Sequence, residues 1–235
     1  MPRLRLPLAL DEFHSLPRNA AYRYELVEGE AWISPRPKYY HARLGLAGFT
    51  PAHAAPVAVR PLRADDWPRL VELFMAAFAA QQPFAGAGGR LREAAEASLA
   101  QTRDGGDGPL IGPACLVAED AGGHAVGAAL VTLVPNTDPE GWDSFLWREP
   151  ADQGHVARRE GWPHLTWVFV ARFEAGRGVG TALLAAVTRE LAALGFDDLF
   201  STFLSGNESS MLWHWRNGFR LLAHPGSWRR LRMRP

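Results

Sequence analysis

The chain has 235 residues, and 47% of them are hydrophobic, which is ordinary for a globular protein with a sizeable core. The formal net charge is +0, so no overall field favours nucleic acid or a membrane surface as a partner. Cys115 is the only cysteine, which excludes an internal disulfide. The longest apolar run, 125–134, is too short to span a bilayer, and residues 1–12 do not form a signal peptide. These features predict a cytoplasmic protein.

Residues 1–46 are predicted to form a separate piece. A short helix is expected at 11–16, followed by two strands at 22–34 that turn near Glu28-Gly29. The run Tyr-Glu-Leu-Val-Glu-Gly-Glu at 24–30, a Pro-rich loop and His41 resemble the start of the Uma2 family, whose fold is restriction-endonuclease-like. The later residues that a nuclease core needs are missing. We therefore expect a non-catalytic fragment that packs against the main domain or a partner subunit.

Residues 47–56 are rich in Ala and Pro and predict a linker to a second domain at 57–235. Apolar residues recur there at helical and strand spacings. The predicted elements are a strand at 57–62, a helix capped by Asp65 or Asp66, a second helix at 90–103, and a hairpin of strands at 114–119 and 124–134.

A long irregular stretch follows at 135–163, which is uncommon in a compact domain and often functional. Acidic and aromatic side chains gather in it, and together they suit a cationic amine. A solvated flap anchored by its tryptophans explains the same composition, and the sequence leaves both readings open. The side chains are Glu140, Asp143, Glu149, Asp152, Glu160, Trp142, Trp147 and Trp162.

Residues 166–184 predict a strand, a glycine-rich turn and a helix. Glycines let the backbone approach a ligand closely, and the first turn of the helix offers unpaired N–H groups at its positive dipole end. The pattern predicts a phosphate or pyrophosphate site. A dinucleotide fingerprint fails, because its third glycine would fall at Thr181 or Leu183, and no lysine supports a P-loop.

Three further elements are expected after the turn. The helix should run from 179 to 194, with Leu194 on its inward face and Gly195 as its C-terminal cap. A strand is predicted at 199–204. The capping-box pattern at 205–208 starts another helix, and the alternation at 228–234 predicts a charged edge strand.

Two of these motifs together resemble the GNAT N-acetyltransferases. The strand end at 168–170 and the turn at 175–180 are similar to the family's acetyl-coenzyme A turn, and residues 207–219 are similar to its second motif, Asn-x-x-Ala-x-x-Leu-Tyr-x-x-x-Gly-Phe. The order and spacing match over roughly residues 56–235. The resemblance implies an α/β (α+β) fold of the acyl-CoA N-acyltransferase type: a mixed, twisted, mostly antiparallel sheet flanked by helices, here preceded by a helix-hairpin extension.

The same resemblance implies an acyltransferase that uses acetyl-coenzyme A and acetylates a primary amine directly. In the family, strand backbone pairs with the pantetheine arm, and the turn's N–H groups hold the pyrophosphate. The implied cofactor-binding residues are Phe169, Val170, Ala175, Gly176, Arg177, Gly178, Val179, Gly180, Thr181 and Asn207. Ala175 departs from the family's Arg or Gln, and Arg177 is expected to supply the lost positive charge.

Direct transfer needs a base for the ammonium and a proton for the departing thiolate. His214 occupies the position of the family's tyrosine and is the predicted acid, although a helix residue bonded to the core would look the same. His164, just before the turn's strand, is the predicted base, with Glu119, Asp120 and Asp143 as alternatives that also fit structural roles. Cys115 reads as core, and the lack of paired ligand spacing argues against a metal.

Two other functions remain open at this stage. Ala175 and the missing tyrosine also fit a catalytically inactive module that binds or senses acyl-coenzyme A. An interaction module derived from a nuclease rests on residues 1–46 alone. The acceptor is open among small amines, antibiotics, peptide N-termini, lysines and aminoacyl-tRNA, and so is the oligomeric state, a homodimer included.

Overall fold

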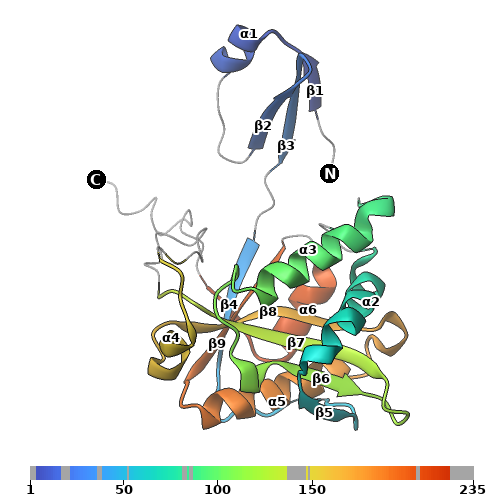
Figure 1. Ribbon diagram of the computed structural model, residues 1–235, viewed down its shortest axis with the longest axis vertical. Helices are drawn as coiled ribbons and strands as arrows, with labels where there is room; N and C mark the ends of the chain where they lie inside the picture. The colour runs from blue at the N-terminus through green and yellow to red at the C-terminus, as the bar shows by residue number, and fades with distance from the viewer. Residues whose placement is uncertain are drawn as a thin grey trace. The chain divides into compact units, whose positions relative to one another are not determined.

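The computed structural model of the chain (Figure 1) describes residues 4–16, 22–35, 39–51, 53–80, 84, 87–136, 147, 149–204 and 207–222. The chain forms two compact units, Met1–Tyr39 and Tyr40–Pro235. Within the described ranges, no helix has the length and apolar character needed to cross a membrane. The strand predicted at 228–234 lies outside the described residues, as do Glu140, Trp142 and Asp143.

The first unit is a small three-stranded sheet with one helix. The predicted helix and hairpin are confirmed, and Glu28 and Gly29 connect the hairpin with φ values of 53° and 77°, as a tight two-residue turn requires. Phe13 and Ala31 are its buried apolar residues among those described. The elements are β1 (Leu4–Pro7), α1 (Leu10–Ser15), β2 (Tyr22–Val27) and β3 (Glu30–Pro35), in the sheet order β1-β3-β2.

The second unit is built on a seven-stranded sheet with the order β10-β4-β9-β8-β7-β6-β5. Strands β5 to β8 pair antiparallel with their neighbours, whereas β8 and β9 are parallel. This mixed, mostly antiparallel sheet confirms the predicted fold class. The strands are β4 (Tyr39–Gly45), β5 (Ala58–Pro61), β6 (Leu116–Glu119), β7 (Ala125–Val134), β8 (Trp162–Val170), β9 (Asp198–Leu204) and β10 (Arg220–Leu221).

Strand β4 shifts the expected boundary between the two parts of the chain. The sequence predicts that residues 1–46 form the N-terminal piece, but the division falls after Tyr39, because β4 lies between β10 and β9. Ala42 and Leu44 are buried in the core of the main sheet. Arg43, between them, points to the other face and binds both carboxylate oxygens of Asp198 at 2.7 Å. A strand anchored in this way belongs to the second unit.

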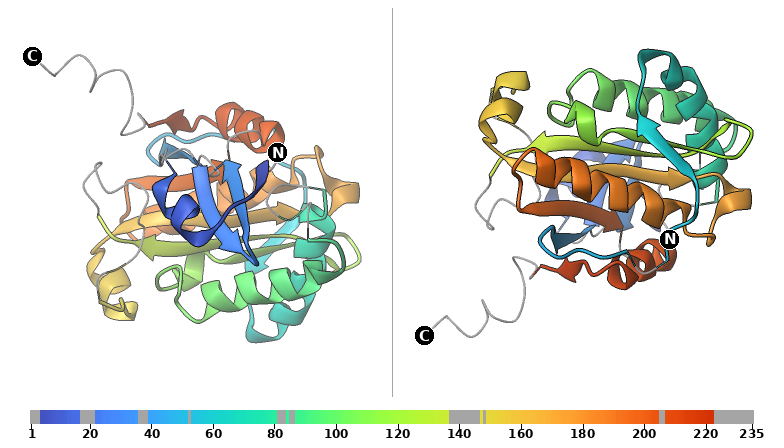
Figure 2. Two further views of the ribbon diagram at one scale, coloured as in Figure 1. Left: turned by 90° about the horizontal axis from the view of Figure 1, so that it is seen from above. Right: turned by 90° about the horizontal axis from the view of Figure 1, so that it is seen from below.

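Helices cover both faces of the main sheet (Figure 2). One face carries α5 and the other α2 and α3, because each helix has an apolar stripe to bury. On the α5 side the core includes Leu165, Leu183 and Leu199, and on the α2 side it includes Phe74 and Leu130. The helices are α2 (Trp67–Phe78), α3 (Leu91–Arg103), α4 (Gln153–Arg158), α5 (Val179–Ala193) and α6 (Glu208–Arg216).

Several predicted details of the helices are wrong. Asp66 does not cap α2 with its side chain; it binds the Arg60 guanidinium through both oxygens at 2.7 Å instead. The cap of α6 is Asn207, whose side-chain oxygen accepts from the N–H of Ser210, and the helix therefore starts later than the 205–208 pattern suggested. Leu194 is 39% exposed, because α5 ends one residue before it.

Candidate active site

The predicted cofactor turn joins the end of β8 to the start of α5. The chain makes a 3₁₀ turn at Arg172–Glu174, and α5 begins at Val179 as predicted. Its N-cap is Gly178, in the left-handed conformation, so no side chain caps the helix. The first N–H groups of α5 therefore lack an intrahelical partner and lie at the positive end of the dipole. They belong to Val179, Gly180 and Thr181.

Space and charge at this turn fit an anionic phosphate group. A Cβ on Gly176 would meet no described atom within 4 Å, so the space beside this residue is open. Ala175 offers no polar side chain, and Arg177 is the cation that lies between Gly176 and Gly178. The Arg177 guanidinium is 68% exposed and pairs with Glu174 at 3.4 Å, which keeps it at the turn. The residues present can therefore hold the phosphates of coenzyme A.

Strands β8 and β9 diverge in front of the turn. They pair at two positions, His164 with Phe200 and Leu165 with Ser201. Within the described residues no further pair joins them, although β8 continues to Val170, where its other edge is still paired with β7. The backbone of residues 166–170 is thus left available to an extended ligand on the β9 side, which is how a peptide-like arm binds a strand.

A β-bulge marks the point where the two strands separate. Leu165 pairs with Val131 and Trp167 with Leu130, so Thr166 is an extra residue on β8. Bulges redirect side chains and are common next to active sites. The two β8–β9 pairs, the bulge and the start of the opening therefore lie together at residues 164–166, which we call the apex.

His164 lies at the apex with both ring nitrogens engaged. Its Nδ1 is 3.1 Å from the Thr166 hydroxyl, and its Nε2 is 2.9 Å from the Thr202 hydroxyl. The side chain is buried, and burial lowers the pKa of His164 to about 3, with further lowering from the positive charges that His41 and His214 can carry. The ring is therefore neutral near pH 7, with one nitrogen protonated and the other able to accept a proton.

His214 lies on α6 and approaches the apex from the opposite face of the sheet. Its Nδ1 is 2.7 Å from the backbone oxygen of Ser210, which accepts only, so Nδ1 carries the proton. Its Nε2 must then accept from the Ser201 hydroxyl, 2.8 Å away. Burial lowers the pKa of His214 to about 4, which favours this neutral form. The ring has no N–H aimed at the apex; the Ser201 hydroxyl stands between them.

Aromatic rings pack on the α2 side of β8, beyond the bulge. Phe74 contacts Trp167 and Phe169 with centroid distances of 4.9 and 5.5 Å, and Phe78 packs against the same pair. The Trp167 indole N–H donates to Thr102 at 2.8 Å. This packing fixes the strand that carries the bulge, and it buries the Phe169 side chain, so only the backbone of Phe169 can serve a cofactor.

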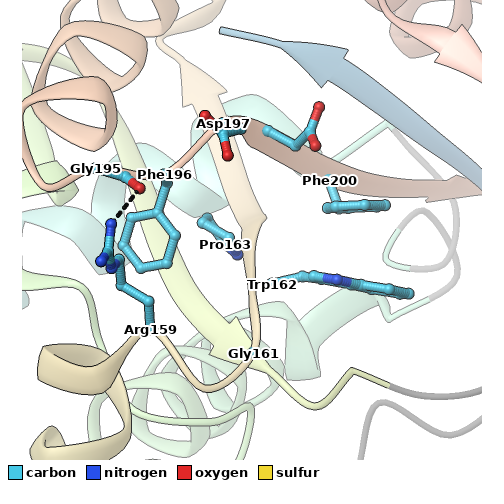
Figure 3. Close-up of a pocket in the computed structure, with 9 residues that line it drawn as sticks. Arg159, Gly161, Trp162, Pro163, Gly195, Phe196, Asp197 and Phe200 are labelled. Atoms are coloured by element: carbon cyan, nitrogen blue, oxygen red, sulfur yellow. Dashed lines mark hydrogen bonds between the residues drawn. The ribbon is translucent and has the colours of Figure 1, made fainter.

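A hollow of about 330 Å³ lies at the N-terminal ends of β8 and β9 (Figure 3). Trp162 and Phe200 line it as a stacked pair with centroids 4.5 Å apart. Arg159 also lines it and donates to the backbone oxygen of Gly195 at 2.8 Å. None of the residues predicted for the cofactor or for catalysis lines this hollow, so it is separate from the cofactor turn.

The other residues that the sequence suggested for catalysis or acceptor binding make structural contacts. Glu119 accepts from Arg60 at 2.7 Å, and Asp120 accepts from two backbone N–H groups of its own turn. Asp152 caps α4, and Glu160 pairs with Arg158. Cys115 is buried, and burial raises the pKa of its thiol to about 11. No group of three or more His, Cys, Asp or Glu side chains in the described ranges could hold a metal ion.

Comparison with known proteins identifies the family. The acetyltransferase (GNAT) family model matches residues 67–219. The GCN5-related N-acetyltransferase from Sphaerobacter thermophilus is 16% identical, with a TM-score of 0.52, and the match covers 80% of this chain and 50% of that one. The PaiA N-acetyltransferase from Thermoplasma acidophilum, in complex with coenzyme A, is 13% identical, with a TM-score of 0.49 and coverages of 73% and 94%. No curated protein matches the chain.

The chain belongs to the GNAT acetyltransferase family, because the family model matches well over half of it. The resemblance inferred from the two motifs is thereby confirmed, and acetyl-coenzyme A is the acyl donor that this family uses. The fold shared with the Sphaerobacter protein confirms the acyl-CoA N-acyltransferase type of architecture, although this chain spans only half of that protein's length. No comparison supports the Uma2 resemblance of residues 1–46.

Sequence reasoning missed four polar residues around the apex. Thr166, Ser201 and Thr202 contact the two candidate histidines, and His41 contacts Thr202. Single hydroxyls in strands carry no motif, and His41 was assigned to the N-terminal fragment. Only the pairing of β4, β9 and β8 brings these residues together, so no local signal could have found them.

Proposed function

We propose that this protein transfers the acetyl group of acetyl-coenzyme A directly to a primary amine, of a small molecule or of a protein. The observation that carries the proposal is the apex, where β8 and β9 separate beside a bulge and His164 meets two hydroxyls. The activity is assigned to a domain at 57–235 together with β4, and residues before β4 are given no catalytic role.

The donor-binding roles follow the divergence of the strands. The backbone of Phe169 and Val170 would hold the pantetheine arm, and the uncapped first turn of α5 would bind the pyrophosphate. Arg177 adds a positive charge that Ala175 cannot supply. The side-chain oxygen of Asn207 is used to cap α6, so its part in donor binding is to fix the start of that helix beside the opening.

The reaction requires two proton transfers, one from the acceptor amine and one to the departing thiolate. Acetyl-coenzyme A supplies an acyl group activated as a thioester. The acceptor must lose a proton before its nitrogen can attack, and His164, reached through the Thr166 hydroxyl, is a neutral base beside the opening. The thiol side of the reaction needs a proton in return. That proton is balanced by the second one that the nitrogen loses as the amide forms. Ser201 donates its own hydroxyl hydrogen to His214 on the other face, so this pair has a positioning role in β9.

Two measurements test this function. Acetyl-coenzyme A at a hundredfold excess over its dissociation constant should stabilise the protein by roughly 2.7 kcal/mol, read as a rise in melting temperature that NAD and ATP do not produce. Release of free coenzyme A is then measured with a panel of amines. His164→Gln should lower turnover by at least about a hundredfold, whereas Thr188→Val, which removes a hydroxyl bonded within α5, should leave turnover unchanged.

The outcomes separate the hypotheses. Binding with coenzyme A release identifies an enzyme, and the amine that is consumed names its acceptor. Binding without release by any amine in the panel contradicts the proposed transfer and leaves the non-catalytic acyl-coenzyme A module. Turnover that survives intact in His164→Gln would show that another group removes the proton.

A further inference from the structure

A row of five hydrogen-bonding side chains crosses four neighbouring strands of the main sheet. The Thr132 hydroxyl on β7 is 2.8 Å from that of Thr166 on β8, which is 3.1 Å from Nδ1 of His164. Nε2 of His164 is 2.9 Å from the Thr202 hydroxyl on β9, which is 3.4 Å from Nδ1 of His41 on β4. These contacts follow the sheet order β7-β8-β9-β4 without a gap.

Every member of the row can both give and take a proton. A hydroxyl donates one hydrogen and accepts at its lone pairs, and a neutral imidazole has one nitrogen of each kind. Three strand spacings give the row a length of roughly 15 Å. A proton that enters at one point can therefore leave at another by shifting each hydrogen to its neighbour, with no side chain changing place.

The chemistry at the apex needs such an exit. Burial and the charges that His41 and His214 can carry disfavour an imidazolium at His164, so a proton taken from an amine has to move on from this residue. Thr166 is the more accessible neighbour and stands in the bulge, where a substrate proton would arrive. The row leads from there to β4, which is next to the last strand of the sheet.

The surroundings of His41 suit the far end of this path. The next side chain on the same face of β4 is Arg43, which is already paired with Asp198 at 2.7 Å, so its charge is offset. His41 is 8% exposed, as is His164, and Tyr40, one residue earlier, is 40% exposed. A positive charge on His41 lowers the pKa of His164, so a proton held at His41 keeps His164 neutral. The other titratable group that acts on His164 is His214, on the opposite face. His41 is thus the member of the row that lies farthest from the bulge toward the β10 side of the sheet.

We propose that His41 is the final proton acceptor of this row, so that strand β4 contributes a relay residue to the reaction. In the balanced step, the Thr166 hydroxyl takes the amine proton and passes its own to Nδ1 of His164. The Nε2 proton of His164 moves to Thr202, and the Thr202 hydroxyl proton moves to Nδ1 of His41. His41 gains one proton, and Thr166, His164 and Thr202 each gain and lose one, so their charges do not change. The use of the relay rests on the proposed function.

The first test follows the His164 ring N–H without any substrate. Its exchange with solvent is measured by NMR in the full chain with ¹⁵N-labelled histidine, and His164→Gln identifies the signal. Thr202→Val and His41→Gln should each slow the exchange by about tenfold or more, because they interrupt the row, whereas Thr202→Ser keeps the hydroxyl and the rate. Damage to the fold would instead admit water and speed the exchange. Unchanged or faster exchange in Thr202→Val would overturn the relay.

The second test measures acetyl transfer in the same variants. Thr202→Val should lower kcat by about tenfold or more with KM for acetyl-coenzyme A unchanged, and Thr188→Val should match the wild type. If the wild type transfers no acetyl group but the exchange rate still depends on Thr202, the proposed function is contradicted and the proton path is supported. If the wild type is active and Thr202→Val changes neither the exchange rate nor kcat, the relay is contradicted and the proposed function stands.

Discussion

Two glycines of the cofactor turn share a backbone conformation but differ in their surroundings, and this difference gives a sharp prediction. Gly176 has φ +78° and Gly178 has φ +89°. A Cβ on Gly176 meets no described atom within 4 Å. A Cβ on Gly178 would lie 2.5 Å from the backbone oxygen of His53 and 2.9 Å from the nitrogen of Ala55. Gly178 is therefore needed for packing within the chain, and Gly176 borders the space that a phosphate would use.

The two alanine variants should consequently differ in stability. The left-handed conformation costs an alanine about 1–2 kcal/mol at either position. Gly178→Ala adds the displacement of backbone atoms, about 1–3 kcal/mol more. For a chain of this size each kcal/mol moves the melting temperature by roughly 2–4 °C, so Gly176→Ala should lose about 5 °C and Gly178→Ala about 10 °C.

Ligand response separates the two positions a second time. The new methyl group of Gly176→Ala stands in the open space, and we expect acetyl-coenzyme A to bind about tenfold more weakly, about 1.4 kcal/mol, as measured by calorimetry or by the ligand-induced rise in melting temperature. Relative to its loss of stability, Gly178→Ala should lose less affinity for acetyl-coenzyme A than Gly176→Ala does. Equal stabilities for the two variants, or an unimpaired affinity in Gly176→Ala, would refute this account of the turn.

Three other outcomes are expected. Cys115 should resist alkylation at pH 8 in the folded protein and react on unfolding, because its thiol is buried with a pKa of about 11; rapid labelling seen by mass spectrometry would contradict this. Stability should fall as the pH drops from about 6.5 toward 4, since an unfolded chain protonates its histidines first, while burial holds the pKa of His214 at about 4 and that of His164 at about 3; a melting temperature that stays flat over this range would argue against neutral buried rings. Asn207→Ala should cost about 1 kcal/mol through the lost cap, and an unchanged response to acetyl-coenzyme A would restrict Asn207 to that capping role.

The turn could be predicted from the sequence because its information is local. Strand, glycines and helix follow one another within 166–184, and each step has its own spacing rule. The same holds for the C-terminal end of α5, where Gly195 adopts φ +81° after the last turn, as expected. The cap of α6 was misplaced by two residues, because Ser205 and Asn207 both satisfy the composition rule and only the geometry distinguishes them.

The position of β4 could not be predicted in the same way. Its seven residues follow a Pro-rich loop and read as the end of the preceding fragment. Their burial alternates only from Ala42 onward, and their partners, β9 and β10, come more than 150 residues later in the chain. Pairing at such separation depends on the whole sheet, so a local pattern cannot assign it. His41 was lost from the candidate site for the same reason.

Ser201 and Thr202 explain how one strand serves both of the predicted catalytic histidines. Consecutive side chains of a strand point to opposite faces of the sheet. Ser201 meets His214 on one face, and Thr202 meets His164 on the other. The path that leads to His164 therefore lies on one face, and the Ser201–His214 pair lies on the other, with β9 between them. His164 and His214 thus bond to different hydroxyls, and a substitution at Thr202 leaves the Ser201–His214 hydrogen bond in place.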